Sequence, residues 1–211
     1  MQYSKNNKLI IIGASGHGKV IADIAIKMNL WDRFFFLDDN EDLKNSLGIN
    51  VIGKVSDAEK YINEYDFFIA IGSNASREKV QNRMIEAGAF IATLIHPDSV
   101  IGNQVEIGRG TAVMAGTVIN CCTKIGQGCI INTGATIDHD NKIGDFVHVS
   151  PGANTAGTVA IGKKTWLGIG TKVSNNVTIT DECIFGAGAV VIEDITKPGT
   201  YVGVPARRIN K

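Results

Sequence analysis

The sequence predicts two domains: an α/β N-terminal domain of Rossmann-like type over residues 1–93, and an all-β parallel β-helix over residues 94–211. The first half of the chain alternates short apolar runs, which are typical of buried strands, with segments of helical periodicity. The second half repeats a six-residue pattern without an insertion. The 24 glycines among 211 residues agree with the repeat, since many of them fall in phase with it.

The repeat starts at Ile95 and places a large apolar residue at nearly every sixth position up to Val191. Sixteen of these seventeen residues are large and apolar, and Thr155 is the exception. The residue two positions before each of them is small, with Asn141 as the one polar exception of any size, and glycine often follows. A helix cannot produce a period of six, whereas a short strand and a tight corner can. Three hexads close one triangular coil, in which glycine and asparagine are expected to adopt the positive φ of the corners.

The four cysteines are expected to be thiols rather than disulfides. Cys129 and Cys183 lie three whole coils apart on small inward positions, and we interpret them as core fillers. None of the four forms a C-x-x-C pair, so no zinc or other metal site is predicted.

Composition narrows the possible partners. The chain has 21 basic and 21 acidic residues, so it lacks the polybasic surface that binding to nucleic acid or an anionic membrane requires. Its first apolar run, Leu9–Ile12, is too short for a signal peptide or a membrane span. We therefore expect a cytoplasmic protein that binds neither nucleic acid nor membrane.

The first half is expected to run strand, helix, strand, helix, strand, helix over residues 9–12, 18–30, 34–37, 57–65, 66–71 and 76–87. In a parallel sheet of this type, ligands bind beyond the carboxyl ends of the strands. The first such end is the glycine-rich stretch LIIIGASGHGKV. It is not a P-loop, because Val20 stands where a hydroxyl must bind Mg²⁺, and its spacing does not fit the dinucleotide fingerprint. A single nucleotide diphosphate fits it better.

Three clusters meet at this edge of the sheet and form the candidate substrate site. Backbone N–H groups of the glycine turn would bind a phosphate. The acidic pair after the second strand would accept hydrogen bonds from a ribose or a base, and the arginine would pair with a phosphate. A tight strand–helix turn with solvated charges, in which His17 only caps the helix, remains the alternative. The candidate residues are Gly13, Ser15, Gly16, His17, Gly18, Asp38, Asp39, Gly72, Asn74 and Arg77.

Two histidines of the coil are candidates for catalysis. By phase, His139 lies at a corner between Asp138 and Asp140, where a carboxylate would fix its tautomer and raise its basicity for proton transfer. A solvated surface histidine is the alternative. His148 precedes Val149 and should point outward from a different face, too far from His139 to share a substrate within one coil. We therefore expect the two histidines to meet only across a subunit boundary. His96 is interpreted as structural.

Five motifs, GASGHG, the acidic pair after the second strand, AIGSN, DHD and GVPARRI, occur in this order. Together they resemble the bacterial nucleotide-sugar acetyltransferases of the sialic-acid and bacillosamine pathway type, over essentially the whole chain. The unbroken hexads resemble the left-handed β-helix of the hexapeptide acyltransferase superfamily. This resemblance implies a left-handed coil, a homotrimer, acetyl-CoA as acyl donor and a UDP-linked 4-amino sugar bound by the N-terminal domain.

The resemblance also assigns residue roles. His139 would be the general base and Asp140, where several members have Glu, its orienting carboxylate. His148 would lie near the acyl group, and the backbone N–H of Gly157 would bind the thioester oxygen. Gly157, Gly170 and Pro205 would contribute to the coenzyme pocket.

The expected function is therefore acetyl-CoA-dependent N-acetylation of a UDP-linked amino-dideoxy sugar. Two alternatives stay open: an O-acetyltransferase acting on sialic acid or another sugar hydroxyl, and a non-catalytic β-helix scaffold with a nucleotide-sensing domain.

Overall fold

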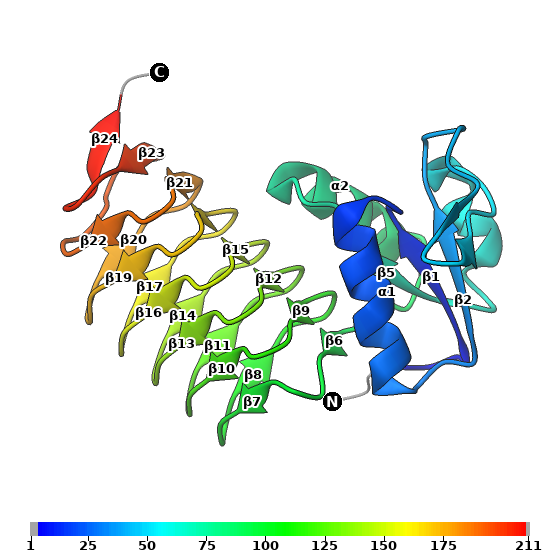
Figure 1. Cartoon of the computed structure of the whole chain (residues 1–211), viewed down its shortest axis with the longest axis horizontal. Coiled ribbons are helices and arrows are strands. Elements are labelled where there is room, and N and C mark those ends of the chain that lie inside the picture. The colour runs from blue at the N-terminus through cyan, green and yellow to red at the C-terminus, as the bar shows by residue number, and fades with distance from the viewer. Residues whose placement is uncertain (1–3, 210–211) are drawn as a thin grey trace. The chain divides into compact units, whose positions relative to one another are not determined.

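The computed structural model describes residues 4–209, and the chain divides between Pro97 and Asp98 into two compact units (Figure 1). The sequence places this boundary near residue 93. Within the described range, no helix is both long enough and apolar enough to cross a bilayer.

The first unit contains a parallel sheet in the spatial order β2-β1-β5. Its strands are β1 (Lys8–Ile12), β2 (Arg33–Leu37) and β5 (Asp66–Ile69). They are almost continuously apolar, as expected for a parallel sheet whose two faces are covered. Helix α1 (Gly16–Met28) follows β1, and α2 (Asn74–Glu86) follows β5, as the sequence predicts. The short elements of this part of the chain are β3 (Asn45–Ser46), β4 (Ile49–Asn50), η1 (Val55–Tyr61) and β6 (Leu94–Ile95).

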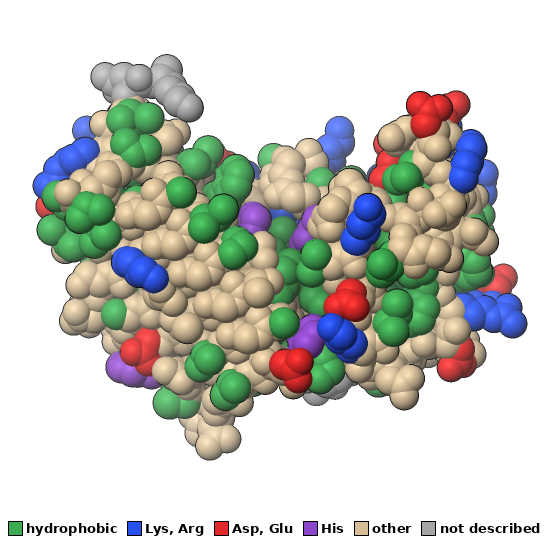
Figure 2. Space-filling model, in the orientation of Figure 1, with side chains coloured by type: hydrophobic (Ala, Val, Ile, Leu, Met, Phe, Trp, Pro, Cys, Tyr) green, Lys and Arg blue, Asp and Glu red, His purple; other side chains and the backbone are tan. Residues whose placement is uncertain are grey.

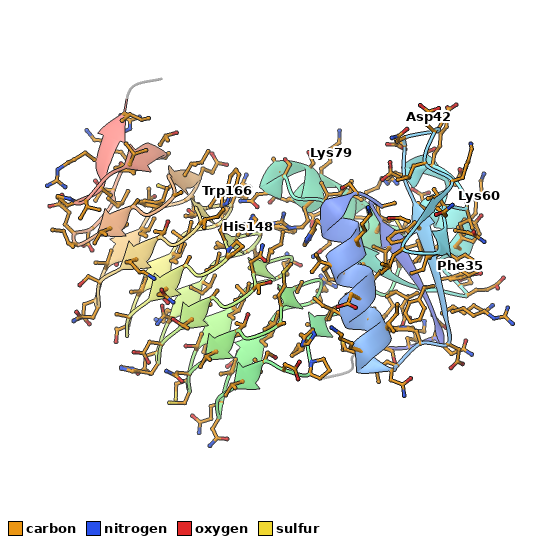
Figure 3. All side chains as sticks on the ribbon, viewed as in Figure 1. Phe35, Asp42, Lys60, Lys79, His148 and Trp166 are labelled. Carbon is orange, nitrogen blue, oxygen red and sulfur yellow. The ribbon has the colours of Figure 1, made fainter. Side chains whose placement is uncertain are left out.

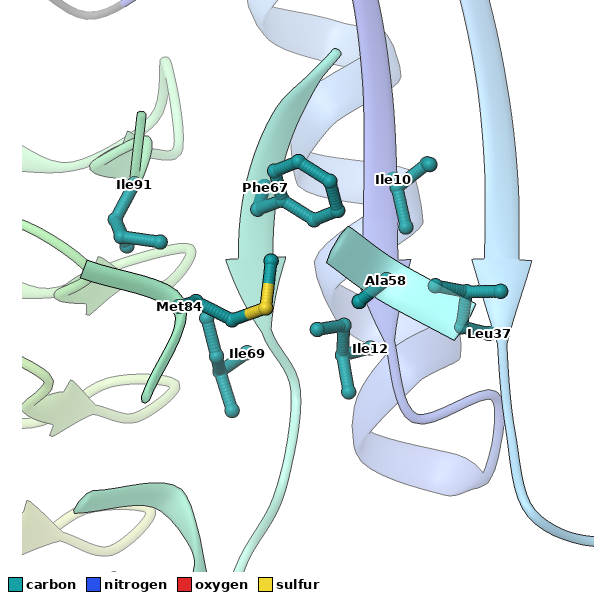
Figure 4. Packing of buried hydrophobic residues seen from close by; sticks show 8 residues of the cluster. All are labelled: Ile10, Ile12, Leu37, Ala58, Phe67, Ile69, Met84 and Ile91. Carbon is teal, nitrogen blue, oxygen red and sulfur yellow. The ribbon is translucent and has the colours of Figure 1, made fainter. Parts of the chain in front are cut away.

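The core of this unit forms between the sheet and the elements that pack on it (Figure 4). Ile10 and Phe67 extend from neighbouring strands, Met84 from α2 and Ala58 from η1. The helix predicted at 57–65 is instead the 3₁₀ helix η1, which begins at Val55 and ends at Tyr61. Ala58 is its one buried residue, so packing gives little support to a longer α-helix.

The second unit is a parallel β-helix with three faces. The first face holds β7 (Val100–Ile101), β10 (Val118–Ile119), β13 (Thr136–Ile137), β16 (Asn154–Thr155), β19 (Lys172–Val173) and β22 (Val190–Val191). The second face holds β8 (Glu106–Ile107), β11 (Lys124–Ile125), β14 (Lys142–Ile143), β17 (Ala160–Ile161) and β20 (Thr178–Ile179). The third face holds β9 (Ala112–Val113), β12 (Ile130–Ile131), β15 (His148–Val149), β18 (Trp166–Leu167), β21 (Cys183–Phe185), β23 (Gly199–Val202) and the antiparallel β24 (Arg207–Ile209). On the side seen in Figure 2, the coil carries few charged groups.

The six-residue period is confirmed as the period of the strands. Strands of successive coils pair in parallel with a shift of eighteen residues, so that Ile119 lies beside Ile137. The large residues of the repeat are buried from Ile107 to Val191. Cys129 and Cys183 are fully buried and fill the core as predicted.

Glycine follows the large residue for a different reason from the predicted one. A Cβ atom on Gly144 would lie 2.7 Å from the backbone nitrogen of Lys163 in the next coil. The positive φ instead falls two residues later, as at Phe146 with φ 57°. Glycine after the step therefore permits close stacking of the coils, and the left-handed corner position accepts other residue types, including Asp140 and Thr158.

Thr155, the exception among the large inward residues, provides a test of core packing. Its side chain is 3% exposed, and its Oγ1 has no hydrogen-bond partner among residues 4–209. Thr155→Val should raise the free energy of unfolding by about 1 kcal/mol, because it removes an unsatisfied buried hydroxyl at nearly constant shape. Thr117→Val is the control and should lower it, because Thr117 Oγ1 donates to the carbonyl of Asn132 at 3.1 Å. Urea denaturation measures both, and a loss of stability in Thr155→Val would contradict the prediction.

Candidate active site

His139 lies at the corner between β13 and β14, where the first face of the coil meets the second. Asp138 supports this corner, because its Oδ1 accepts hydrogen bonds from the His139 backbone N–H at 2.8 Å and from Asn120 Nδ2 at 2.7 Å. Asp140 adopts the left-handed conformation with φ 59°. The imidazole is thus held on a turn whose backbone is fixed by the Asp138 carboxylate, which is itself bonded to Asn120 of the preceding coil.

The side chain of His139 contacts Asp140 through Nδ1, which lies 2.7 Å from Asp140 Oδ2. With Nδ1 as the donor, Nε2 is left with a free lone pair and is able to accept a proton. The hydrogen bond to Asp140 raises the pKa of His139 above its usual value of 6.5, and the charges of Asp138 and Asp140 add to this while partial desolvation opposes it. Both partners are about half exposed, so the site is open to a ligand.

Gly157, one coil later, lies directly against the reactive edge of this ring. A Cβ atom at Gly157 would lie 2.6 Å from both Nε2 and Cε1 of His139. The backbone N–H of Gly157 donates no hydrogen bond within the described part of the chain. The structure therefore brings together three of the four predicted catalytic residues, and it places a free backbone donor beside a proton acceptor.

His148, the fourth, lies on β15 of the third face, as its phase in the repeat predicts. Its ring stacks on Trp166 of β18 with centroids 5.6 Å apart and an interplanar angle of 2° (Figure 3). Its Nε2 lies 3.2 Å from Asn132 Nδ2. We did not predict Trp166 and Asn132, although the eighteen-residue shift already places Trp166 beside His148.

In the first unit, the glycine turn is shaped by close packing. A Cβ atom on Gly13 would lie 2.7 Å from the carbonyl oxygen of Ala70, and one on Gly18 would overlap the carbonyl oxygen of Gly13. Ser15 precedes α1 without a side-chain capping bond, and a Cβ atom on Gly16 would meet open space. The amino end of α1 is therefore left with backbone donors that its N-cap side chain does not satisfy.

His17, in the same turn, is held neutral. Burial, helped by the charge of Arg77, lowers its pKa to about 4. Its Nε2 is buried and has no hydrogen-bond partner within residues 4–209. A buried nitrogen without a hydrogen-bond partner costs free energy in this turn.

The acidic pair after β2 braces the surrounding loops. Asp38 Oδ2 accepts from the Ala14 N–H at 2.7 Å, and Asp39 Oδ1 accepts from the Val55 N–H at 3.0 Å. Beside Asp38 lies a pocket of about 290 Å³, which the sequence did not reveal because its wall includes the loop around β3 and β4. It is lined by Asp38, Asn40, Glu41, Leu43, Lys44, Val51, Gly53 and Lys54.

Arg77 requires a correction. The sequence offered it as a phosphate ligand, but the side chain is 1% exposed. Its guanidinium donates to the carbonyls of Ile71 and Gly72 at 2.9 and 3.1 Å, and to Asn74 Oδ1 at 2.7 Å. Arg77 therefore holds the turn between β5 and α2, and Gly72 and Asn74 serve as its acceptors.

The two other residues predicted for the coenzyme lie apart from the His139 corner. Gly170 forms a corner after β18 with φ 68°, and a Cβ atom there would meet open space. Pro205 is exposed in the loop between β23 and β24. Their role stays a prediction.

The contact between His139 and Asp140 predicts a pH dependence. A general base must be unprotonated, so kcat/KM should fall as the pH drops through the raised pKa of His139. Asp140→Asn removes the main cause of the increase, so the acid limb should move to lower pH. Asparagine tolerates the left-handed conformation, so the turn should survive. Glu182→Gln, at another left-handed corner, is the control and should leave the limb in place. An unmoved limb in Asp140→Asn would separate this carboxylate from the base.

The PglD N-terminal domain family matches residues 8–84. The solved acetyltransferase domain of PglB from Neisseria gonorrhoeae is 36% identical with a TM-score of 0.93, and the match covers 97% of this chain and 100% of that one. PerB from Caulobacter crescentus, solved with CoA and GDP-perosamine, is 34% identical with a TM-score of 0.91, covering 96% of this chain and 97% of that one. UDP-N-acetylbacillosamine N-acetyltransferase of Bacillus subtilis is 35% identical over 112 residues, half of each chain.

The hexapeptide coil and these matches place the chain in the class of left-handed β-helix acyltransferases. The chain belongs to the family of nucleotide-sugar N-acetyltransferases that carry a PglD N-terminal domain. The alignment spans only half the length of the Bacillus subtilis relative, while it spans the whole of the PglB domain.

Proposed function

We propose that this chain transfers the acetyl group of acetyl-CoA to the amine of a UDP-linked amino-dideoxy sugar. The single observation that carries the proposal is the corner at which His139 Nε2 lies against Gly157 while Nδ1 contacts Asp140. The transfer needs no covalent enzyme intermediate, because positioning of the two substrates and stabilisation of the developing charge suffice.

The chemistry follows from the two groups at this corner. The amine attacks the thioester carbonyl, a C–N bond forms, and the N–H of Gly157 donates to the oxyanion. His139 Nε2 takes the proton that the attacking nitrogen loses. The C–S bond then breaks, and the proton passes to the departing thiolate of CoA, which restores the neutral base. Only glycine allows the ring of His139 to lie this close to the backbone, which brings Nε2 next to the residue whose N–H would bind the oxyanion.

Features of the first unit favour an acceptor sugar that carries a nucleotide. The amino end of α1 offers backbone donors for a diphosphate, and the pocket beside Asp38 combines carboxylate, lysine and apolar groups, as recognition of a base and a ribose requires. The PerB structure holds GDP-perosamine, and the Bacillus subtilis relative is named for a UDP sugar. We take UDP as the nucleotide here, and calorimetry with UDP and GDP on the whole protein tests this choice. Tighter binding of GDP would reverse it.

We further propose that the protein acts as a homotrimer whose sites lie between subunits. His139 lies where the first and second faces meet, and His148 lies on the third face, which is opposite that corner in a triangular coil. One subunit therefore cannot present both rings to one substrate.

Complementation tests the trimer. His139→Ala and His148→Ala should each be nearly inactive alone. In a trimer that contains both variants, one of the three interfaces combines two intact histidines, so mixed trimers should regain about a third of the sites. The control is a mixture of each variant with itself after the same unfolding and reassembly. Absence of any recovery in trimers shown to be mixed would contradict a shared site.

The activity itself is tested by thiol release from acetyl-CoA with UDP-, GDP- and dTDP-linked 4-amino sugars, and with free sialic acid. Transfer to a nucleotide-linked amine and not to a hydroxyl is expected. Transfer to a sialic acid hydroxyl would favour an O-acetyltransferase. If none of the acceptors in the panel supports thiol release, the proposal is contradicted.

A further inference from the structure

Asn141 is an unusual residue for its place in the coil. It occupies the small inward position of its hexad, which Thr123 fills one coil earlier and Val159 one coil later. Its side chain is fully buried. A buried amide costs free energy unless its polar atoms are bonded, so the contacts of Asn141 need an explanation.

Threonines at this position elsewhere in the coil make one common hydrogen bond. Thr111 Oγ1 donates to the carbonyl of Gly126 at 2.8 Å, and Thr123 Oγ1 donates to that of Asp138 at 2.8 Å, in each case fifteen residues ahead. Asn141 makes the equivalent bond, because its Nδ2 lies 2.9 Å from the carbonyl oxygen of Ala156.

Asn141 also makes two further contacts, of which the one to the residue two positions earlier has no counterpart among the threonines; Thr171 Oγ1 makes the other kind, to the carbonyl of Gly168 three residues earlier at 2.8 Å. The same Nδ2 lies 2.9 Å from the carbonyl oxygen of Asp138 and 3.1 Å from that of His139. These are two carbonyls of the turn that carries the imidazole. One amide group therefore ties that turn to the following coil.

The acceptor in the following coil is informative. The carbonyl of Ala156 and the N–H of Gly157 belong to the same peptide group, so a hydrogen bond to this oxygen fixes the plane in which the N–H points. It also polarises the peptide and strengthens its N–H as a donor. The amide of Asn141 thus contacts both backbone segments that form the candidate site.

We propose that Asn141 is a positioning residue, which locks the His139 turn and the Ala156–Gly157 peptide in register. This inference rests on the proposed function. Asn141 touches neither substrate nor reacting atoms, and it acts through the orientation of His139 and of the Gly157 N–H.

The charged surroundings of His139 determine what loss of this contact would change. Asp138 and Asp140 flank the ring on its own turn, and Cys122 on the preceding corner interacts with Asp140. The following corner supplies Gly157, which has no titratable group. A looser turn weakens the contact between His139 and Asp140, so the pKa of His139 should fall toward its ordinary value.

Two substitutions separate the contacts. Asn141→Val removes all three hydrogen bonds. Asn141→Thr keeps one donor, which can reach Ala156 or Asp138 as the hydroxyls of Thr111 and Thr171 reach their equivalents, and it loses the bond to His139. Threonine occupies the equivalent position at Thr111, Thr117, Thr123, Thr165 and Thr171, so Asn141→Thr should fold. The matched control is Thr111→Val, which removes a buried hydrogen bond of the same kind on a different side of the coil.

The readouts are kcat, KM for both substrates, the pH profile of kcat/KM, and NMR titration of His139 in the substrate-free protein. Asn141→Val should lower kcat at least tenfold with KM within twofold, and should move both the acid limb and the titration of His139 to lower pH. Asn141→Thr should shift the pH profile in the same direction with a smaller loss of kcat. Thr111→Val should change neither.

Folded Asn141→Val and Asn141→Thr proteins with the kcat and His139 titration of the parent would overturn the inference, and so would an effect confined to KM. The proposed function fails separately, if the parent protein acetylates no nucleotide-linked amine. In that case the NMR titration still decides whether Asn141 positions His139.

Discussion

Replacing His139 by alanine should lower kcat by about 10²–10⁴-fold, the usual contribution of a general base. The imidazole Nε2 lies against Gly157, and the contact of Nδ1 with Asp140 favours the tautomer in which Nε2 accepts a proton. KM for the nucleotide sugar should change little, because the side chain at the corner contributes no part of the nucleotide site. Steady-state kinetics with both substrates varied measures this.

The matched control for this prediction is His96→Gln, since His96 is a buried histidine for which we propose no catalytic role. Circular dichroism and the melting temperature of His139→Ala should equal those of the parent, because the ring is half exposed. Parent-like turnover in a folded His139→Ala protein would remove this residue from the mechanism.

Gly157→Ala should lower kcat about 10²-fold, which is the cost of a displacement of about 1 Å at the reacting atoms. The new Cβ atom would lie 2.6 Å from Nε2 and Cε1 of His139, so the ring must swing away from the N–H of Gly157. The obstructing atoms belong to a half-exposed side chain, so the fold should yield without loss of stability.

Gly144→Ala is the contrasting variant. Its Cβ atom would lie 2.7 Å from the backbone nitrogen of Lys163, which cannot move without opening the coil. We expect it to lower the melting temperature by about 4 °C or more. Kinetics and calorimetry on both proteins should show a lower kcat with an unchanged melting temperature for Gly157→Ala, and a lower melting temperature for Gly144→Ala. A Gly157→Ala protein with parent-like kcat would show that the ring need not lie where the structure places it.

Much of the fold was predictable because each coil repeats the same local pattern. The large inward residues were identified from periodicity alone, and burial confirms those from Ile107 to Val191, whereas Ile101 in the first coil is 36% exposed. The role of the recurrent glycines was not predictable, because it depends on contact with a neighbouring coil, as between Gly144 and Lys163. Phase identifies which residues face inward, but it gives no information on the spacing between coils.

The candidate site was predictable only in part, for a related reason. His139 and Asp140 are adjacent in sequence, so their contact could be anticipated, whereas the approach of Gly157 spans one coil and came from the family resemblance. Arg77 was misjudged because its hydrogen bonds are made to its own turn, which a charge in a sequence does not reveal. The lysines beside Asp38 were missed because short hairpin strands have a weak signal.

The corners of the coil have a consequence for the protein's capacity to change. Residues 120–122, 138–140, 156–158 and 174–176 form a ladder outside the apolar interior, with the left-handed position of each filled by a different residue type. Residues of the ladder can therefore determine activity while the inward residues determine stability, so new activities can arise on the ladder without loss of the fold. Asn141 is the interior residue that links the two, and a library that varies the ladder should therefore hold it constant.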